Sequence, residues 1–114
     1  MEEFDIAIIG GGPAGIMAAI AASADLNIVL LEKNSSLGSK LLITGGGRCN
    51  ITNEKPIKKL LNSFHDKNFL KHSFYTFTNE MLLDLFRNRG LDFIVEDNNR
   101  VFPETEKSQD ILAI

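Results

Sequence analysis

Three glycines and one acidic residue near the start of the chain have the types and spacing of a dinucleotide-binding site. Gly10, Gly12 and Gly15 follow the pattern Gly-x-Gly-x-x-Gly. In this pattern the first glycine permits a tight turn, the second lets a pyrophosphate approach the backbone, and the third lets a helix pack closely on a strand. Glu32 stands 22 residues after Gly10, where a carboxylate accepts hydrogen bonds from a ribose diol. The spacing predicts a dinucleotide site, and the carboxylate disfavours NADP there because it would repel a 2′-phosphate.

A second glycine-rich stretch, residues 44–50, carries a different set of chemical groups. Its sequence is Thr-Gly-Gly-Gly-Arg-Cys-Asn, with glycines at positions 45–47. Consecutive glycines lose much backbone entropy on folding, which predicts that the backbone here lies close to something flat or bulky. Arg48 offers a fixed charge and a planar set of donors. It could contact a pyrophosphate, stabilise an anionic reduced flavin, or remain solvated or paired with a carboxylate.

Cys49 is the single cysteine of the chain, so no internal disulfide can form. The residue could be a redox-active thiol with a pKa lowered by Arg48, a metal ligand, or a small packing residue. No second cysteine supports a metal site or a flavin-disulfide mechanism. We therefore interpret Cys49 as a packing residue and expect no metal site. A lone cysteine also favours a reducing, intracellular setting, and we expect a cytoplasmic protein.

The remaining candidates for chemistry are interpreted as structural. His65 and His72 are flanked by lysines without partner spacing, so we expect both on the surface. Three lysines are expected on a solvated face: Lys55, Lys58 and Lys59. Four phenylalanines are expected in the core, because base stacking needs a basic surface around the rings: Phe64, Phe69, Phe74 and Phe77. No catalytic acid or base can be assigned.

The first glycine motif requires a strand before it and a helix after it, and the sequence supplies both. Residues 5–9 and 27–31 are apolar runs, which is typical of strands buried on both faces of a parallel sheet. Residues 14–23 between them are rich in alanine and predict a helix. Strand, helix and strand make a βαβ unit, and the helix N-terminus would present free N–H groups to phosphates.

The rest of the chain is predicted to form short helices and one hairpin. Helices are expected over residues 56–63 and 68–77, and a third begins at Asn79 as its N-cap and ends at a glycine. Residues 91–102 have the pattern of a hairpin. Ser108 could cap a last helix.

The composition limits the classes of protein. The 114 residues are 44% apolar and 24% charged, with a formal net charge of −3, which is typical of a globular chain and excludes disorder. A mildly acidic chain is a poor candidate for general nucleic-acid binding, so we expect no nucleic-acid partner. Glycines interrupt the apolar run over residues 6–24, and acidic residues precede it. Both features argue against a signal peptide or a membrane span.

In combination, these motifs resemble those of the bacterial aminoacetone-oxidase-like (BaiN-like) FAD-dependent oxidoreductases. The residues that carry the resemblance are the glycine motif at 10–15, Glu32, the stretch 40–53 and the sequence Arg-Val-Phe-Pro at 100–103. The resemblance extends over essentially the whole chain, and its most specific part is Thr-Gly-Gly-Gly-Arg-Cys-Asn. The family usually has arginine where this chain has Ser39 and glycine where it has Asn99.

The resemblance implies an α/β fold, with a Rossmann-like FAD-binding βαβ unit of the glutathione-reductase type followed by helices and a hairpin. It implies FAD as cofactor and hydride transfer through the flavin N5, with a small-molecule substrate and with NAD(P)H or oxygen as second partner. The glycine motif and Glu32 would hold the ADP half, and the second loop would lie near the flavin. The residues expected to bind the cofactor are Gly10, Gly12, Pro13, Ala14, Gly15, Glu32, Lys33, Lys40, Thr44, Gly45, Gly46, Gly47, Arg48, Cys49 and Asn50.

Family members are much longer than this chain, and its last residues begin an apolar face with nothing after it. We therefore expect residues 1–114 to be the N-terminal part of an FAD-binding domain, with the remainder of that domain and a substrate domain beyond residue 114. Three alternative interpretations remain: an NAD-dependent dehydrogenase built on the same βαβ unit, an FAD-containing tRNA-modifying protein, and a non-catalytic truncated folding unit.

Overall fold

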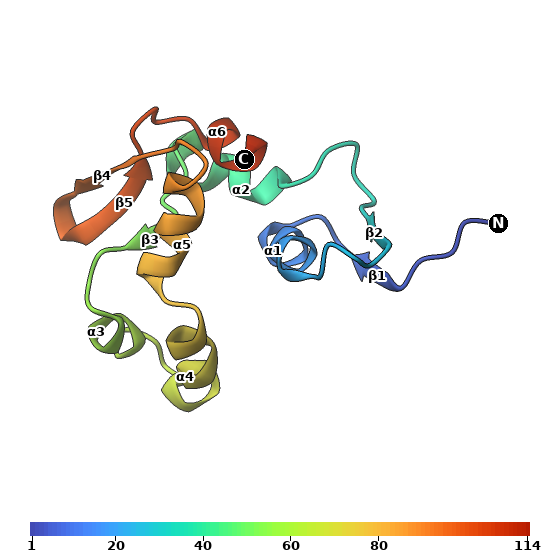
Figure 1. Ribbon diagram of the computed structural model, residues 1–114. Helices are drawn as coiled ribbons and strands as arrows, with labels where there is room; N and C mark the ends of the chain where they lie inside the picture. Colours follow the sequence, from blue (N-terminus) through green and yellow to red (C-terminus); the bar gives the residue numbers. More distant parts are fainter. The chain divides into compact units, whose positions relative to one another are not determined.

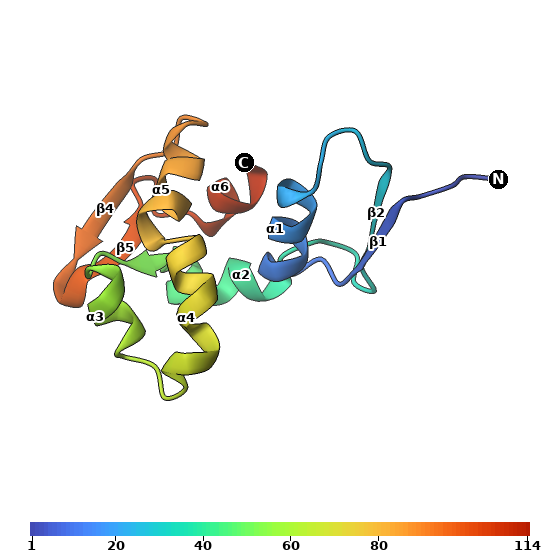
Figure 2. The ribbon, with the colours of Figure 1, turned by 60° about the horizontal axis from the view of Figure 1, so that its bottom comes forward.

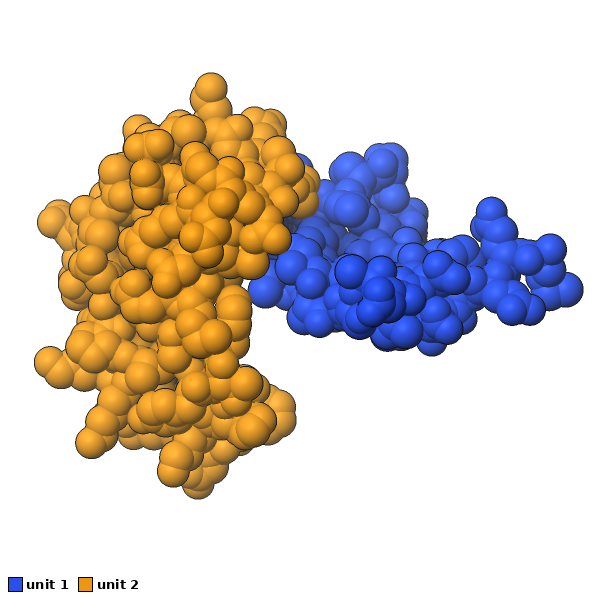
Figure 3. All heavy atoms as spheres, in the orientation of Figure 1, with its two compact units in different colours: residues 1–42 blue, residues 43–114 orange.

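A computed structural model describes all residues, 1–114, and divides the chain into two units. The first unit is Met1–Leu42 and the second is Ile43–Ile114, as coloured in Figure 3. Each unit is described by itself below.

The first unit is a βαβ element, as the glycine motif predicts. Strand β1 (Ile6–Ile9) leads through the glycine turn into helix α1 (Pro13–Ala21), which is followed by strand β2 (Ile28–Leu31). The two strands pair in parallel, with Ile6 opposite Ile28 and Ile9 opposite Leu31 (Figure 1). Proline suits the first turn of α1 because its missing N–H would have no partner there.

The prediction that both strands are buried on both faces is wrong for this chain. Alternate residues of β1 are exposed, and the side chains of Ile9 and Leu31 are 78% and 51% accessible. The physical reason is that α1 is the helix in contact with this two-stranded sheet, and one helix covers one face. No residue of α1 is buried either.

The connection to the second unit contains a helical turn and the second glycine-rich stretch. Helix α2 (Ser39–Ile43) includes the apolar residues 41–43. It is followed by the 3₁₀ turn η1 (Thr44–Gly47). Inside this turn Gly45 and Gly46 have φ angles of +55° and +67°, a left-handed conformation that glycine adopts without strain.

The second unit is built on a three-stranded antiparallel sheet with the order β3-β5-β4. Its strands are β3 (Thr52–Asn53), β4 (Phe93–Glu96) and β5 (Arg100–Pro103), and β4 and β5 form the predicted hairpin. The hairpin turn η2 (Asp97–Asn99) holds Asn99 at φ +59°. Asparagine tolerates this left-handed conformation, so the departure from the family's usual glycine is accommodated locally.

Four helices complete the second unit. They are α3 (Ile57–Leu61), α4 (Lys67–Thr76), α5 (Asn79–Arg87) and α6 (Ser108–Ala113). Helices α3 and α4 lie beside each other, and α6 packs against β5 (Figures 1 and 2). The core consists of buried apolar residues: Cys49, Leu61, Leu83, Phe86, Leu91, Val101, Phe102 and Ile111. None of the helices is long and apolar enough to cross a membrane.

Two predicted helix caps are wrong by one residue. Thr78, not Asn79, is the N-cap of α5, and its hydroxyl oxygen accepts a hydrogen bond from the Met81 N–H. Asn79 is instead buried, and its amide links α5 to the segment around β3. The N-cap of α6 is Lys107, and Ser108 is the first helical residue. At Thr78-Asn79 two residues that favour caps adjoin, so the sequence does not decide which one the backbone uses, and at Lys107-Ser108 the boundary differs by the one residue by which helix ends commonly vary.

The prediction of a phenylalanine core over residues 64–77 is also largely wrong. Phe69 is 79% accessible, and Phe64 and Phe77 are exposed as well. Phe74 is half-buried and meets the ring of Phe64 edge to face, with ring centroids 5.2 Å apart. Helix α4 turns one side towards α3 and leaves its other sides to solvent.

Candidate functional site

The turn between β1 and α1 is held by the chain's own hydrogen bonds. The Gly10 N–H donates to the carbonyl of Leu31 over 2.8 Å, and the Gly11 N–H donates to Glu32 Oε2 over 2.7 Å. Gly10 has φ +101°, a conformation that L side chains rarely adopt. A Cβ at Gly15 would overlap the carbonyl oxygen of Gly10. Both positions therefore require glycine for the fold itself.

Gly12 differs from these two glycines, because nothing in the protein demands glycine there. Its φ is −79°, and a Cβ built on it meets no atom within 4 Å. The space beside it is therefore open to a ligand. Gly12 is also the N-cap of α1, and no side chain caps this helix end. Pro13 has no N–H, so the free donors of the first turn begin at Ala14, which is exposed.

Glu32 lies beside this turn, with both carboxylate oxygens fixed by the chain. While Oε2 accepts from Gly11, Oε1 accepts from the Asn34 N–H over 2.8 Å and from Asn34 Nδ2 over 2.7 Å. The hydrogen bond from the Asn34 backbone, followed by that from Gly11, holds the pKa of Glu32 below its ordinary value, so the carboxylate is charged at neutral pH. Oε1 thus already accepts two hydrogen bonds, whereas Oε2 accepts one and keeps lone-pair capacity for a further donor.

Two residues of this region were not singled out from the sequence. Asn34 fixes Glu32, and Gly11 is buried against the segment after β2, where a Cβ would overlap the side chain of Leu37. The Gly38 N–H also donates to the Gly11 carbonyl over 2.8 Å. The weak signal for Asn34 was its place two residues after Glu32, since asparagine side chains bond to nearby backbone and side chains in turns.

Three features fit the ADP half of a dinucleotide: the open space beside Gly12, the uncapped N-terminus of α1 and the charged Glu32 carboxylate. The backbone donors match a pyrophosphate, and the carboxylate matches a ribose diol. Lys33 is exposed next to Glu32, and Lys40 is exposed on α2.

The second glycine loop, residues 44–50, is packed on the chain's own aromatic side chain. A Cβ at Gly45 would lie 2.9 Å from a ring carbon of Phe102 and 2.8 Å from the Asn50 nitrogen, whereas one at Gly46 meets nothing within 4 Å. The flat group that the glycines predict is thus, at Gly45, the buried Phe102 ring. The side-chain amide nitrogen of Asn50 donates a hydrogen bond to the Thr52 carbonyl over 3.0 Å.

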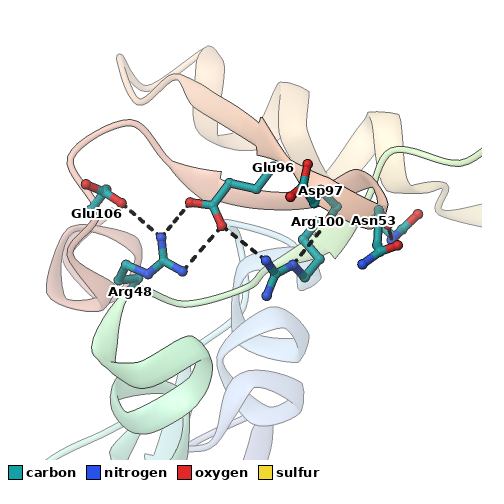
Figure 4. A network of polar contacts seen from close by, with 7 residues as sticks. Arg48, Asn53, Glu96, Asp97, Arg100 and Glu106 are labelled. Carbon is teal, nitrogen blue, oxygen red and sulfur yellow. Dashed lines mark hydrogen bonds and ion pairs between the residues drawn. The ribbon is translucent and has the colours of Figure 1, made fainter.

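Arg48 is paired with carboxylates, which is one of the alternatives that the sequence leaves open. Its Nη1 lies 2.6 Å from Glu96 Oε1 and 2.9 Å from Glu106 Oε1 (Figure 4). Its guanidinium carbon lies 4.1 Å from the centroid of the Phe102 ring. Hydrogen bonds to Glu96 and then to Glu106 raise the pKa of Arg48, and the bond from Arg48 lowers the pKa of Glu96. The positive charge is therefore compensated within the second unit, and a contact of Arg48 with the cofactor stays a prediction.

Cys49 is 2% accessible, which agrees with a packing residue. Its φ is +62°, and its N–H donates to the Thr44 carbonyl over 3.0 Å. Burial raises the pKa of the thiol, so a reactive thiolate is disfavoured. The alternative of a redox-active thiol with a pKa lowered by Arg48 is therefore disfavoured, and the guanidinium of Arg48 pairs with Glu96 and Glu106 instead.

Comparison with known proteins places the chain in a family. The sequence profile of the HI0933-like protein Rossmann domain matches residues 4–114. A 3-dehydro-bile acid delta(4,6)-reductase from Clostridium scindens is 34% identical over 112 residues, which cover 96% of this chain and 27% of that protein. A ribosomal RNA dihydrouridine synthase from Escherichia coli is 33% identical over 112 residues, with the same coverage of 96% and 27%.

A dihydrolipoyl dehydrogenase from Caenorhabditis elegans is 39% identical over 74 residues, which cover 64% of this chain and 13% of that protein. The chain spans about a quarter of the length of the first two relatives, 27% in each case. The family match and these identities agree with the resemblance drawn from the motifs. The chain therefore belongs to the HI0933-like Rossmann domain family, that of the BaiN-like FAD-dependent oxidoreductases.

Proposed function

We propose that this chain forms the N-terminal part of the FAD-binding domain of an oxidoreductase, and that its βαβ unit holds the ADP half of FAD. The observation that carries the proposal is the contrast between Gly15 and Gly12. The fold needs glycine at position 15 for packing, whereas it leaves open space beside Gly12. A glycine that the fold does not need, at an uncapped helix end, is explained by a ligand that approaches the backbone.

The residues of the first unit divide the binding between them. Backbone N–H groups at the start of α1, from Ala14 onward, would bind the pyrophosphate with the help of the helix dipole. Glu32 would accept hydrogen bonds from the ribose hydroxyls, and Asn34 and Gly11 keep its carboxylate in place. The negative charge of Glu32 would also repel a 2′-phosphate, so NADP is not expected at this site.

FAD, once bound, supplies a hydride acceptor and donor at flavin N5. We propose that residues 44–50 lie near the flavin end, with Gly46 offering the open backbone position. NAD(P)H or oxygen would be the second redox partner. No side chain of this chain is assigned as general acid or base.

The substrate is proposed from the relatives. Their names describe a reductase of a 3-dehydro-bile acid and a dihydrouridine synthase of ribosomal RNA. We propose that this protein likewise reduces an unsaturated substrate with hydride from its flavin. The choice between a small steroid-like molecule and a nucleoside in RNA is made by testing both as oxidants of the reduced enzyme.

The first experiment is a titration of the purified chain with FAD and, separately, with NADH, followed by flavin fluorescence and the visible spectrum. Saturable FAD binding that Gly12→Val removes supports the proposal. Binding of NADH but not of FAD would favour the dehydrogenase alternative. If neither binds, the same titration on a protein as long as the relatives decides, because FAD binding there, again lost in Gly12→Val, would show that the pocket needs further residues.

A further inference from the structure

The basic residues of this acidic chain are concentrated in one segment. Residues 55–77 hold five of the twelve Lys and Arg residues but one of the fifteen Asp and Glu residues. These five residues are Lys55, Lys58, Lys59, Lys67 and Lys71. None of them takes part in the ion pairs of the structure, which involve arginines. The net charge of −3 thus conceals a positive surface with uncompensated ammonium groups.

The same segment exposes aromatic rings. Phe64, Phe69, Tyr75 and Phe77 are all accessible, and Phe69 is the most accessible of them at 79%. On α4, Lys67, Lys71 and Tyr75 follow one another at intervals of four, so they share one side of the helix. Phe69 and Ser73 share another side by the same spacing. The ring of Tyr75 therefore shares a side of this helix with two ammonium groups, whereas Phe69 is exposed on a different side.

A cavity lies beside two of these rings, Phe64 and Phe77, and the strand β3. It has a volume of about 530 Å³, within the range of small-molecule sites of about 300–1,000 Å³. Its lining includes the rings of Phe64, Phe74 and Phe77 and the side chains of Ser73 and Thr78. The Thr78 hydroxyl keeps its proton free for donation, since its oxygen accepts from the Met81 N–H.

The nearby amide groups are already occupied by the fold. Asn79 donates to the carbonyls of Asn53 and Lys55 over 2.7 Å and 3.0 Å, and Asn53 donates to the Asn98 carbonyl over 2.8 Å. The groups available to a ligand in the cavity are therefore mainly ring faces and aliphatic side chains, the latter from Ile51, Leu60 and Leu82, together with a few hydroxyls. Such a lining accepts a flat, partly polar ring without reading a particular hydrogen-bond pattern.

We propose that the surface of α3, the loop 62–66 and α4 binds single-stranded nucleic acid. The five lysines of residues 55–71 bind phosphates, Phe69 stacks on a base, and an unstacked base enters the cavity. A positive surface with interleaved aromatic rings is the arrangement that binds single strands with little sequence preference. None of the lysines and rings of this surface lies in the βαβ element or among residues 44–50, which are proposed to lie near the flavin, although Asn50 of that loop also lines the cavity.

An anionic membrane is the other surface that attracts lysines and exposed rings, and the structure favours it less. A helix that lies in a membrane interface needs a free apolar face opposite its charges. On α4 the apolar side with Phe74 is turned to Phe64 and α3 instead. Of the exposed rings, Phe64 and Phe77 line the cavity, and Tyr75 shares a side of α4 with Lys67 and Lys71, so the rings do not form one apolar face.

The test measures fluorescence anisotropy of labelled 15-nucleotide oligouridylate and oligodeoxythymidylate titrated with the chain. We expect saturable binding at 50 mM salt that weakens about 10- to 100-fold at 200 mM, as for release of counterions from three to five phosphates. Equal affinity for the two oligonucleotides indicates backbone and ring contacts alone, and tighter binding of oligouridylate adds contacts to the 2′-hydroxyl. Either result supports the proposal.

Two variants localise the binding. Lys67→Glu/Lys71→Glu should weaken it at least tenfold and reduce its salt dependence, whereas Arg89→Glu/Lys107→Glu changes the net charge equally outside the segment and should alter it far less. Phe69→Ala should weaken it about 5- to 150-fold, the range for loss of one stacked base. Ile43→Ala, at a residue 75% accessible, is the matched control for an exposed apolar side chain. Circular dichroism verifies that each variant is folded.

Three results would overturn the proposal: no saturable binding at 50 mM salt, equal weakening by each variant and its control, or a segment that binds vesicles instead. For the last, the chain is sedimented with vesicles of phosphatidylserine and phosphatidylcholine. Vesicle binding that is lost in Lys67→Glu/Lys71→Glu, together with no oligonucleotide binding, would assign this surface to a membrane. The variants Lys67→Glu/Lys71→Glu and Phe69→Ala change no residue proposed to bind FAD, so they should keep the FAD affinity of the natural chain, and the two proposals fail independently of each other.

Discussion

Arg48 and Glu96 are 48 residues apart in the sequence, and their side chains meet at two points. Nη1 lies 2.6 Å from Oε1 and Nη2 lies 3.4 Å from Oε2. The pair joins the glycine loop to the end of β4, and Glu106 adds a second carboxylate to the same guanidinium. We infer that Arg48 fixes the shape of the loop that begins at Thr44.

Breaking this pair should destabilise the second unit. Arg48→Met leaves two carboxylates near each other without their shared cation, so the midpoint of thermal unfolding should fall. It should fall about twice as far as in Arg87→Met, whose partners Glu80 and Asp84 are exposed on one helix. In a double-mutant cycle with Glu96→Gln, the two substitutions should be non-additive. Strict additivity would contradict a direct coupling of Arg48 and Glu96.

The pair should also make stability depend on pH. The bond from Arg48 holds the pKa of Glu96 below its ordinary value of 4.5 in the folded chain. A lowered folded pKa contributes stability that is present above the unfolded value and is lost as pH falls through the folded pKa. Between pH 6 and pH 3, the midpoint of thermal unfolding should therefore fall further in the natural chain than in Arg48→Met. Parallel curves for the two proteins would speak against this linkage.

Substitution of Gly15 should lower the stability of the fold, whereas substitution of Gly12 should lower the affinity for FAD. Gly15→Ala places a Cβ against the Gly10 carbonyl and should cost about 1–3 kcal/mol of unfolding free energy. Gly12→Ala meets no atom and should change that free energy by about 1 kcal/mol or less, because it alters only the helix cap. In whichever of the two titrated proteins binds FAD, the chain or the longer protein, Gly12→Ala should however raise the dissociation constant for FAD at least tenfold. Denaturant unfolding and flavin titration measure the two effects, and undiminished FAD affinity would remove Gly12 from the phosphate site.

Cys49 should be chemically inert in the folded chain. It is buried, and burial raises the pKa of its thiol, so reaction with an aromatic disulfide reagent at pH 8 should be slow and should become fast in denaturant. In the protein that binds FAD, the Cys49→Ser variant should retain most of the flavin content of the unsubstituted protein. Rapid modification under native conditions, or loss of turnover in Cys49→Ser with FAD retained, would replace the packing interpretation by a redox role.

The parts of the fold that were predicted correctly depend on neighbours in sequence. The βαβ unit follows from two apolar runs and a glycine turn within residues 5–31, and the hairpin of β4 and β5 from an Asn-Asn turn between two β-prone runs. Each pattern contains most of the information that forms it, because the paired strands are joined by a short turn in the hairpin and by a single helix in the βαβ unit.

The parts that were missed depend on distant residues. No local signal links Arg48 to Glu96, or Gly45 to Phe102, because only the folded sheet of the second unit brings β4 and β5 to the glycine loop. The exposure of Phe69 was missed for a related reason. An apolar residue on a helix is buried only where another element covers that side, and α3 covers another side of α4.

The hydrogen bond from Gly11 to Glu32 has a consequence for how a nucleotide would be received. The Glu32 carboxylate, which is proposed to bind the ribose, already accepts a hydrogen bond from Gly11 in the turn that is proposed to bind the phosphates. Folding alone thus sets the spacing of the two contact points, so association needs little further ordering of the backbone. Glu32 thereby gives the site its rigidity as well as its charge, and replacing it should weaken the contacts to the ribose and to the pyrophosphate at the same time.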